Sequence, residues 1–248
     1  MTIEPHSYPD YPFTPPPPRT ELQLPTTRPV VTYILLGLNI LIFFGLPATL
    51  KLYGMLIPGA ALYYGMWWQW LTTGFLHADL AHIAFNMYAL HILGRELEKL
   101  FGMQRFIAVY FLSLLGGSVL VTLLSPLNQP TLGASGAILG LMGALAAYFV
   151  QHKDILLNGR SQLRHILTTV LINLGIGLLP GISLWGHLGG FLAGLGAGAA
   201  LLPRYRLLEY PQLHMERKSL SPHHYALTML IFVVEVALLG LAFIIRRG

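Results

Sequence analysis

Residues 104–124, QRFIAVYFLSLLGGSVLVTLL, form a long apolar run whose single charged side chain, Arg105, stands near its beginning. An α-helix needs about 20 mostly apolar residues to cross the hydrocarbon core of a bilayer. This stretch therefore predicts a membrane-spanning helix.

Six further runs of the same kind lie near residues 31–50, 81–99, 135–151, 165–180, 184–202 and 225–245. Hydrophobic residues make up 54% of the 248 residues, charged residues make up 10%, and the mean hydropathy is +0.62. Soluble domains carry roughly 25% charged residues. The sequence therefore predicts an all-α polytopic membrane protein with seven spanning helices.

The segments between and beyond these runs suggest how the chain is organised. The stretch from Lys51 to His77 is aromatic and broken by Pro58, so we expect it to lie partly in the membrane interface. The chain holds no cysteine, which excludes cysteine nucleophiles, thiolate metal sites and disulfides. We expect four parts: a Pro-rich disordered cytoplasmic tail at 1–28, a six-helix core at 29–202, an exposed linker at 203–224 and a seventh helix at 225–248.

The basic residues predict the orientation of the chain in the membrane. The 15 Lys and Arg outnumber the 10 Asp and Glu, but they occur in short clusters between apolar runs, which argues against a nucleic-acid partner. Cytoplasmic loops retain Lys and Arg. A cytoplasmic N-terminus would leave only Lys51, Arg246 and Arg247 on the outer side, so we predict that orientation, with the Arg246-Arg247 pair as its one discordant feature.

Four polar residues are predicted to share one depth within this topology. The second helix runs inward and carries His82 and Asn86 on one face, the fourth runs inward from Ser135, and the sixth runs inward and carries His187. Polar side chains inside a membrane are costly and are functional candidates by default. We therefore expect one polar cluster in the outer half of the bilayer.

Small residues surround two members of this cluster. Ser135 lies within Gly133-Ala134-Ser135-Gly136-Ala137, and His187 precedes Gly190 and Gly194, which are spaced by four residues. Small residues let two helix backbones approach closely. Such an approach brings a serine hydroxyl and an imidazole within about 2.6–3.2 Å of each other.

At these positions the chain resembles the rhomboid family of intramembrane serine proteases. The resemblance rests on Gly133-Ala134-Ser135-Gly136, on His187-Leu188-Gly189-Gly190, and on His77, His82 and Asn86 in an HxxxxHxxxN arrangement. Gly94, Glu98 and Gly102 match a GxxxExxxG pattern, and we expect Glu98, with Arg95, to tie the second helix to the cytoplasmic loop. The similarity covers roughly residues 30–202.

The resemblance implies a six-helix core with a Ser135-His187 dyad, no metal and no cofactor, here with a seventh helix appended. His82, Asn86 and the Ser135 backbone N–H would hold the oxyanion, while His77 and the glycines 133, 136, 190 and 194 would support the site. The substrates would be membrane-spanning proteins, cut near the outer face. Substrate identity, cleavage motif and oligomeric state stay open.

Three positions depart from the family pattern. Gln69 stands where an arginine often follows tryptophan, Leu139 stands where many members carry an aromatic ring, and Ser183 stands where an acidic residue is common. The roles of these positions, of the Pro-rich tail and of Glu235 are open.

Other functions remain to be compared. The sequence has no HExxH motif, and its only aspartates, Asp10, Asp79 and Asp154, lie in tails or loops, which argues against metalloproteases and aspartyl proteases. One alternative is a catalytically silent rhomboid-like protein that binds membrane clients. Another is a transporter or proton channel with the histidines and Glu235 as a relay, although a relay predicts polar residues at several depths.

Overall fold

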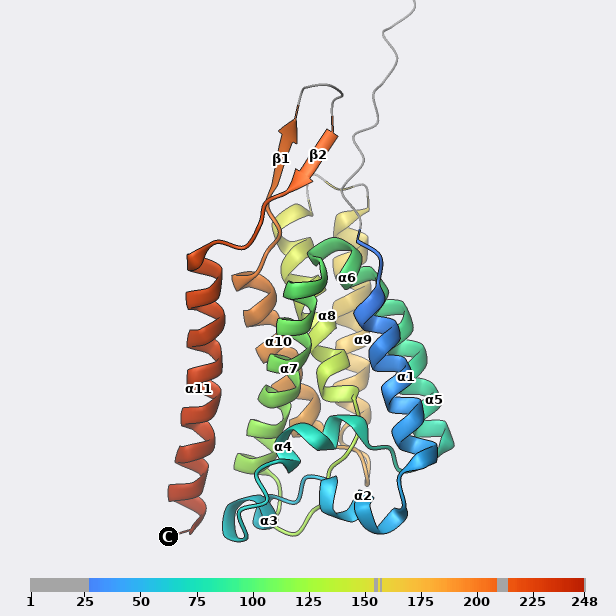
Figure 1. Cartoon of the computed structure of the whole chain (residues 1–248), viewed down its shortest axis with the longest axis vertical. Helices are drawn as coiled ribbons and strands as arrows, with labels where there is room; N and C mark the ends of the chain where they lie inside the picture. Colours follow the sequence, from blue (N-terminus) through green and yellow to red (C-terminus); the bar gives the residue numbers. More distant parts are fainter. Residues whose placement is uncertain (1–26, 154–155, 157, 209–213, 248) are drawn as a thin grey trace, which may run out of the picture.

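The computed structural model describes residues 27–153, 156, 158–208 and 214–247. All but the last two residues of the predicted tail at 1–28 lie outside the described residues. The elements follow one another as α1 (Val30–Gly45), α2 (Ala48–Gly54), α3 (Pro58–Tyr63), α4 (Gln69–Thr72), the 3₁₀ turn η1 (Thr73–Phe75), α5 (Leu80–Ala89), the π-helical segment η2 (Leu90–Gly94), α6 (Arg95–Phe101), α7 (Met103–Leu124), α8 (Ser135–His152), α9 (Gly159–Ile176), α10 (Leu184–Ala200), β1 (Tyr205–Leu208), β2 (His214–Arg217) and α11 (Pro222–Arg247) (Figure 1).

Each predicted apolar run contains a helix, and the prediction of an all-α membrane bundle is confirmed. Among the described residues, α7, α8 and α11 are long and apolar enough to cross a membrane, and α1 is a shorter apolar helix. The second run is one helical path made of α5, η2 and α6. The helix of the fifth predicted run, 165–180, is α9, which begins six residues earlier, at Gly159, and ends at Ile176.

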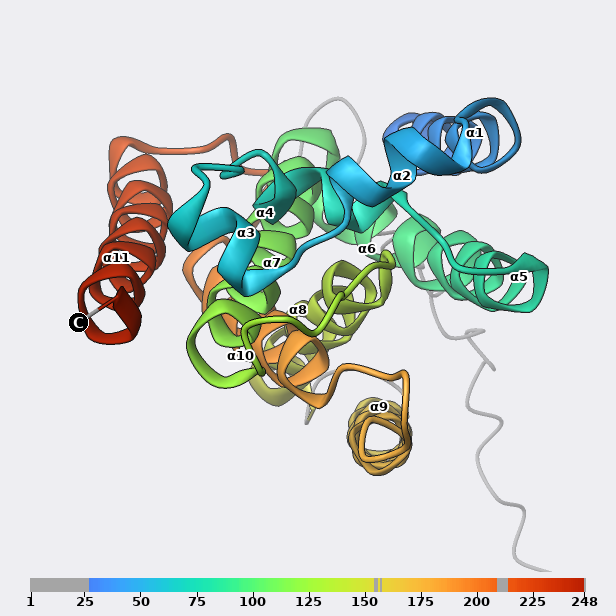
Figure 2. The same ribbon diagram turned by 90° about the horizontal axis from the view of Figure 1, so that it is seen from below.

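Helices α7, α8 and α10 form the centre of the bundle, with α1, α5 and α9 around them (Figures 1 and 2). Glycines make this centre tight. A Cβ atom at Gly190 would overlap the backbone of Gly136, and one at Gly194 would overlap the backbone of Gly140. Helices α8 and α10 are therefore in direct backbone contact, as the small-residue spacing predicted.

The other face of α10 packs on α7 in the same way. A Cβ at Gly189 would overlap the carbonyl of Gly116, and one at Gly117 would stand 2.8 Å from the carbonyl oxygen of Gly186. The segment of α10 that carries His187 is thus held between two helices, and its position cannot shift without separating backbones that touch.

The segment 203–224, expected as a linker, contains secondary structure. Strands β1 and β2 pair antiparallel, with Tyr205 opposite Arg217. The Arg217 guanidinium donates to the Lys99 carbonyl at 2.6 Å and to Thr27 Oγ1 at 2.8 Å, and Arg105 donates to the Lys218 carbonyl at 2.8 Å. The strand pair and the residue after it are therefore fastened to α6 and α7.

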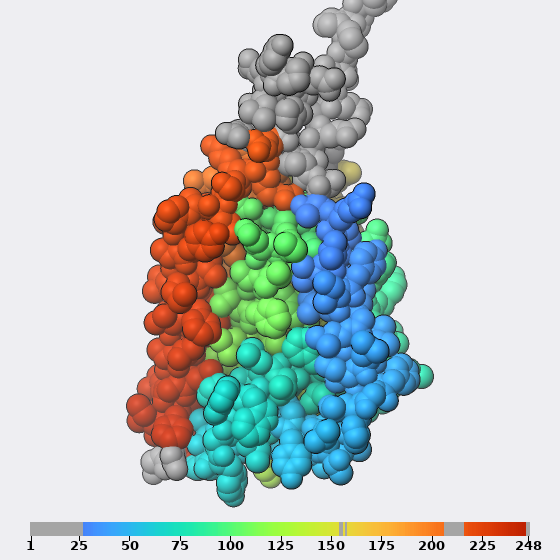
Figure 3. Space-filling model, viewed as in Figure 1, coloured from blue at the N-terminus to red at the C-terminus, as the bar shows by residue number. Residues whose placement is uncertain are grey.

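Helix α11 begins at Pro222, within the expected linker, and stands at one edge of the molecule against α7 (Figure 3). Proline is tolerated at the first position of a helix because its missing N–H has no helical partner there. Near the other end, Arg246 Nη1 donates to the carbonyls of Thr122 and Ser125 at 2.8 and 2.7 Å. The discordant cation thus caps the C-terminus of α7, where the helix dipole favours positive charge.

Glu235 lies in the middle of α11 and is 5% exposed. A Cβ at Gly116 of α7 would stand 3.1 Å from its Oε1 atom, so the side chain faces α7. Neither carboxyl oxygen has a hydrogen-bond partner among the described residues.

Glu98 has a different partner from the one we expected. It is fully buried, and its carboxylate accepts hydrogen bonds from the backbone N–H of Val31 at 2.9 Å, the N–H of Thr32 at 2.8 Å and the Thr32 hydroxyl at 2.7 Å. Arg95 instead contacts His91. A carboxylate at a helix N-terminus satisfies N–H groups that lack a helical partner. Glu98 therefore fastens α6 to the start of α1.

We predict that Glu98→Gln lowers the free energy of unfolding by about 1.5–3 kcal/mol, the usual contribution of a hydrogen bond to a charged group. The substitution removes the negative charge and replaces one accepting oxygen by an NH₂ group, which would face the N–H and hydroxyl donors of Val31 and Thr32. The matched control is Glu96→Gln, because Glu96 lies on the same helix with an exposed side chain. Unfolding in detergent measures the effect, and equal stability of the two variants would contradict the assignment.

Candidate active site

Ser135 is the first residue of α8, and the residues before it have a conformation that depends on glycine. Gly133 has φ of +129°, which L side chains rarely adopt. A Cβ at this position would also lie 2.7 Å from His82 Nε2. Gly133 thus allows the chain to turn into α8 and lets the His82 ring approach Ser135.

The loop before Ser135 is held by the long segment between α1 and α5. Thr131 and Leu56 exchange backbone hydrogen bonds of 2.8 and 2.9 Å, and the Gly133 N–H donates to the Thr73 carbonyl at 3.0 Å. The Thr73 hydroxyl also donates to the Thr131 carbonyl at 2.6 Å. Residues remote in sequence therefore position the candidate nucleophile.

Gln69, one of the three departures from the family pattern, organises that long segment. Its side chain is 1% exposed, accepts from the Ile57 N–H at 3.1 Å and donates to the Tyr53 carbonyl at 3.1 Å. The Trp68 indole N–H donates to the same carbonyl at 3.0 Å. Gln69 thus braces the turn that leads to Leu56, which pairs with Thr131 in the loop of residues 131–134 before Ser135, called the nucleophile loop below.

His187 and Ser135 are in hydrogen-bonding contact, with 2.9 Å between His187 Nε2 and Ser135 Oγ. His187 is 7% exposed and lies in the first turn of α10. This turn begins at Ser183, whose hydroxyl accepts from the Gly186 N–H at 3.1 Å. The second departure, Ser183, is therefore the N-cap of the helix that carries the candidate base.

The other ring nitrogen of His187 faces the end of α9. His187 Nδ1 is 3.4 Å from the Asn173 carbonyl oxygen, which also accepts from the Gly177 N–H at 2.9 Å. If Nδ1 carries the proton and donates here, Nε2 is an acceptor for the Ser135 hydroxyl. Asn173 was missed in the sequence because a backbone carbonyl carries no residue signature.

Leu139, the third departure, is 2% exposed and packs with Met142 and with Val170 of α9. Helix α9 supplies the carbonyl that faces His187. Leu139 therefore helps to hold α9 against α8 through apolar contact.

His82 reaches the site from α5. Its backbone N–H donates to Asp79 Oδ1 at 2.8 Å, so Asp79 caps this helix, and His82 Nδ1 lies 3.5 Å from the Ala78 N–H. An Nδ1 that accepts this weak bond leaves the proton on Nε2. That nitrogen is the atom nearest to the position of a Gly133 Cβ, so a donor faces the space beside Ser135.

Asn86 lies one turn further along α5 and is 7% exposed. Its Nδ2 atom donates to the His82 carbonyl at 2.9 Å. No hydrogen bond joins Asn86 to Ser135 among the described residues. The structure therefore places Asn86 next to the His82 backbone, with one amide N–H used within its own helix.

His77 stands beside His82 at the start of the second helical path. The ring centroids are 5.1 Å apart, and the rings meet edge to face. Burial, followed by the charges of His82 and Lys51, lowers the pKa of His77 to about 4. His77 is thus neutral near pH 7, and neither ring nitrogen has a hydrogen-bond partner in the described part of the chain. Its observed contact is a packing contact with His82.

The sequence-predicted residues are thus brought together to different degrees. Ser135 contacts His187 directly and His82 lies beside Gly133, whereas Asn86 and His77 contact His82. Gly136, Gly190 and Gly194 line the helix contact beneath the site. Within the described ranges, no group of three or more His, Asp or Glu side chains is arranged to hold a metal ion.

The chain is similar in sequence to known proteins. The family model described as "Rhomboid domain" matches residues 64–204, which is more than half of the chain. The "Rhomboid protease GluP" of Bacillus subtilis (strain 168) is 36% identical over 187 residues, covering 71% of this chain and 36% of that protein. The "RHOMBOID-like protein 6, mitochondrial" of Arabidopsis thaliana is 38% identical over 135 residues, covering 54% of this chain and 44% of that protein.

The relatives do not all carry the same description. The "Inactive RHOMBOID-like protein 8" of Arabidopsis thaliana is 33% identical over 147 residues, covering 59% of this chain and 42% of that protein. The aligned parts span about a third to a half of the length of these three relatives. The matched family domain contains Ser135, His187, His82 and Asn86, and the chain is an integral membrane protein that belongs to the rhomboid family.

Proposed function

We propose that the protein is an intramembrane serine endopeptidase that cleaves membrane-spanning proteins through a Ser135-His187 dyad. The observation that supports this most directly is the 2.9 Å contact between Ser135 Oγ and His187 Nε2. The catalytic unit in this proposal is the six-helix part at 29–202, to which α11 is appended.

The proposed reaction is acyl transfer in two steps. His187 Nε2 accepts the Ser135 proton while Oγ bonds to a peptide carbonyl carbon, and the imidazolium then returns that proton to the departing amine as the C–N bond breaks. In the second step His187 takes a proton from a water molecule as its oxygen bonds to the carbonyl carbon of the Ser135 ester, and the imidazolium then returns the proton to Oγ as the C–Oγ bond breaks and the carboxyl product leaves. The Asn173 carbonyl supports this scheme, because a proton held on Nδ1 leaves Nε2 able to act as the base.

Three groups are assigned to the oxyanion. The Ser135 N–H lies at the start of α8, where free N–H groups and the helix dipole favour negative charge. His82 Nε2 stands beside Gly133 and is the second donor. Asn86 is the third donor. One N–H of its side-chain amide donates to the His82 carbonyl, and the other is assigned to the oxyanion.

The substrate must present an accessible peptide bond at the level of Ser135. Helical carbonyls already accept intrahelical hydrogen bonds, so a substrate helix has to unwind before it is cut. Helices that contain glycine or other poor helix formers are the expected substrates. With a cytoplasmic N-terminus, the site opens toward the extracytoplasmic side.

A rhomboid-like protein that binds clients without cutting them is the alternative. The relative whose description contains the word "Inactive" supports this alternative. The contact between Ser135 and His187 favours the protease, since client binding does not require a serine hydroxyl beside an imidazole nitrogen.

We predict that Ser135→Ala and His187→Ala each abolish cleavage of a model membrane substrate with a glycine-containing helix. A fluorophosphonate probe should label the wild-type protein and fail to label Ser135→Ala. Detergent extraction and thermal unfolding check that each variant is folded. Labelling that persists in Ser135→Ala, or cleavage near the wild-type rate in either variant, would show that the dyad is misassigned.

The oxyanion donors should behave differently from the dyad. Removal of one donor slows the chemical step by about 10²- to 10³-fold. We expect His82→Ala and Asn86→Ala to fall in this range and to retain slow fluorophosphonate labelling, with coupled effects in the double variant because both would bind one oxygen. Activity per folded molecule is the measurement. If Asn86→Ala loses activity only in proportion to folded protein, Asn86 braces α5 and is not a donor.

The proposed orientation of the chain in the membrane generates a further prediction. Reporters that are active only in the cytoplasm should be active when fused near residues 101 and 157 and silent when fused near residue 128. This follows from the charge distribution, because cytoplasmic loops retain Lys and Arg. The reverse pattern would place Ser135 in the inner half of the bilayer.

A further inference from the structure

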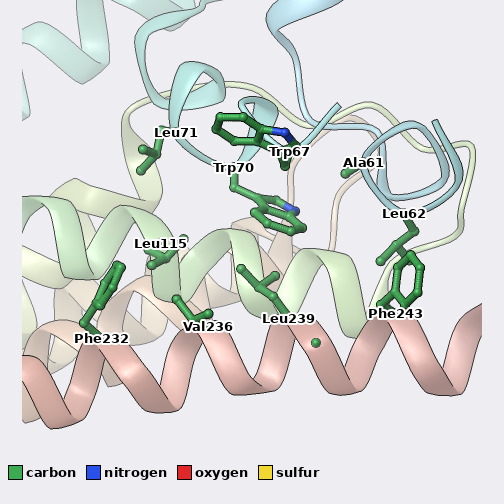
Figure 4. A pocket seen from close by; sticks show the side chains of 11 residues that line it. Ala61, Leu62, Trp67, Trp70, Leu71, Leu115, Phe232, Val236, Leu239 and Phe243 are labelled. Atoms are coloured by element: carbon green, nitrogen blue, oxygen red, sulfur yellow. The ribbon is translucent and has the colours of Figure 1, made fainter. Parts of the chain in front are cut away.

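A pocket of about 450 Å³ lies between α11 and the short helices α3 and α4, with α7 as its floor (Figure 4). Its walls include Trp67 and Leu71 on the side of α4, Leu115 on α7, and Val236 and Phe243 on α11. Pockets of about 300–1,000 Å³ are of the size that holds a small apolar ligand.

The walls of the pocket are almost entirely apolar. The lining residues are aliphatic or aromatic, and the polar side-chain atoms among them are the indole nitrogens of Trp67 and Trp70, of which Trp70 Nε1 is buried with no hydrogen-bond partner among the described residues. A water molecule needs two to four polar partners to occupy an internal site. An empty space would leave the side chains around it without dispersion contacts on one side.

The pocket opens toward the surroundings of the protein. Trp67 is 65% exposed and Phe243 is 40% exposed, although both line the pocket. Helix α11 is itself an apolar span of which only 17% is buried. In an integral membrane protein, such a helix is surrounded by lipid hydrocarbon, so the molecules at the mouth of the pocket are lipid acyl chains.

We propose that this pocket binds one acyl chain of a membrane phospholipid, which lies between α4 and α11 as a resident part of the folded protein. The chain fills the gap that α11 leaves beside α3 and α4. Beyond Phe243, the Arg246 carbonyl accepts a hydrogen bond from the Tyr63 hydroxyl, which links α11 to α3.

The acyl chain contacts the element that positions the nucleophile loop. Trp70 lines the pocket, and its carbonyl accepts from Ser118 Oγ at 2.7 Å, which ties α4 to α7. Three residues later, the Thr73 carbonyl accepts from the Gly133 N–H. Lipid in this pocket thus packs against the support of the loop that leads to Ser135. The site nonetheless exists whether or not the protein is a protease.

Gly240 provides a sharp test because it lines the pocket and a Cβ added there would meet nothing within 4 Å. Gly240→Leu fills the pocket without a backbone clash, and Val236→Trp fills it from the same helix with a second side chain. The matched control is Gly37→Leu, because Gly37 is an exposed glycine of α1 that also has open space around its Cβ. Gel filtration and thermal unfolding verify the fold of each variant.

The probe is phosphatidylcholine with a photoactivatable diazirine near the end of one acyl chain, mixed into phosphatidylcholine nanodiscs that hold the full chain. After irradiation and digestion, we expect labels at the pocket residues of α4 and α11 to exceed labels on the exposed face of α1 several-fold. Gly240→Leu and Val236→Trp should remove this excess, and Gly37→Leu should keep it.

Several results would overturn the proposal. Equal labelling of α11 and α1, or an excess that survives both pocket-filling substitutions, would mean that the pocket holds no resident chain. Cross-links to a second copy of the protein, or loss of the label when a membrane-spanning model peptide is added, would assign the pocket to that partner instead. Because labelling needs no catalysis, these outcomes are independent of the proposed protease activity.

Discussion

Helices α8 and α10 touch each other backbone to backbone, and the rest of the site depends on this contact. Gly136 and Gly140 of α8 face Gly190 and Gly194 of α10 with no room for a Cβ atom at the latter two. In a membrane, helices gain no hydrophobic free energy by associating, so close packing of small residues is a main source of attraction. The same closeness brings a short serine side chain within 2.9 Å of an imidazole. Close helix packing and the candidate Ser-His chemistry therefore both require small residues at these positions.

The second constraint is the need to satisfy backbone groups at helix ends and in loops near an apolar environment. Glu98 accepts the free N–H groups of α1, Asp79 caps α5, Ser183 caps α10, and Arg246 donates to the last carbonyls of α7. Each unpaired polar group costs about 1–3 kcal/mol when buried. These four side chains thus satisfy backbone groups where α1, α5 and α10 begin and where α7 ends.

The long segment between α1 and α5 holds the loop before Ser135 in place through hydrogen bonds. Gln69 organises its turn, Leu56 pairs with Thr131, and Thr73 holds Gly133. The nucleophile loop is therefore shaped by residues about 60 positions earlier in the chain. The proposed acyl-chain site borders the same segment through Trp70 and Leu71, between α4 and α11.

The amino-acid sequence by itself determined the seven helical runs, the glycine faces and the candidate residues Ser135, His187 and His82, because hydropathy and helical spacing are local properties. Only the tertiary structure decided the partners of those residues. Nothing local indicates that the Asn173 carbonyl faces His187, that Glu98 caps α1, or that strands β1 and β2 pair. The same holds for Asn86: the sequence placed it on the helix face of His82, but only the structure shows that its amide donates to the His82 carbonyl. These contacts arise when segments far apart in the chain meet, and a meeting point depends on the packing of all the helices at once.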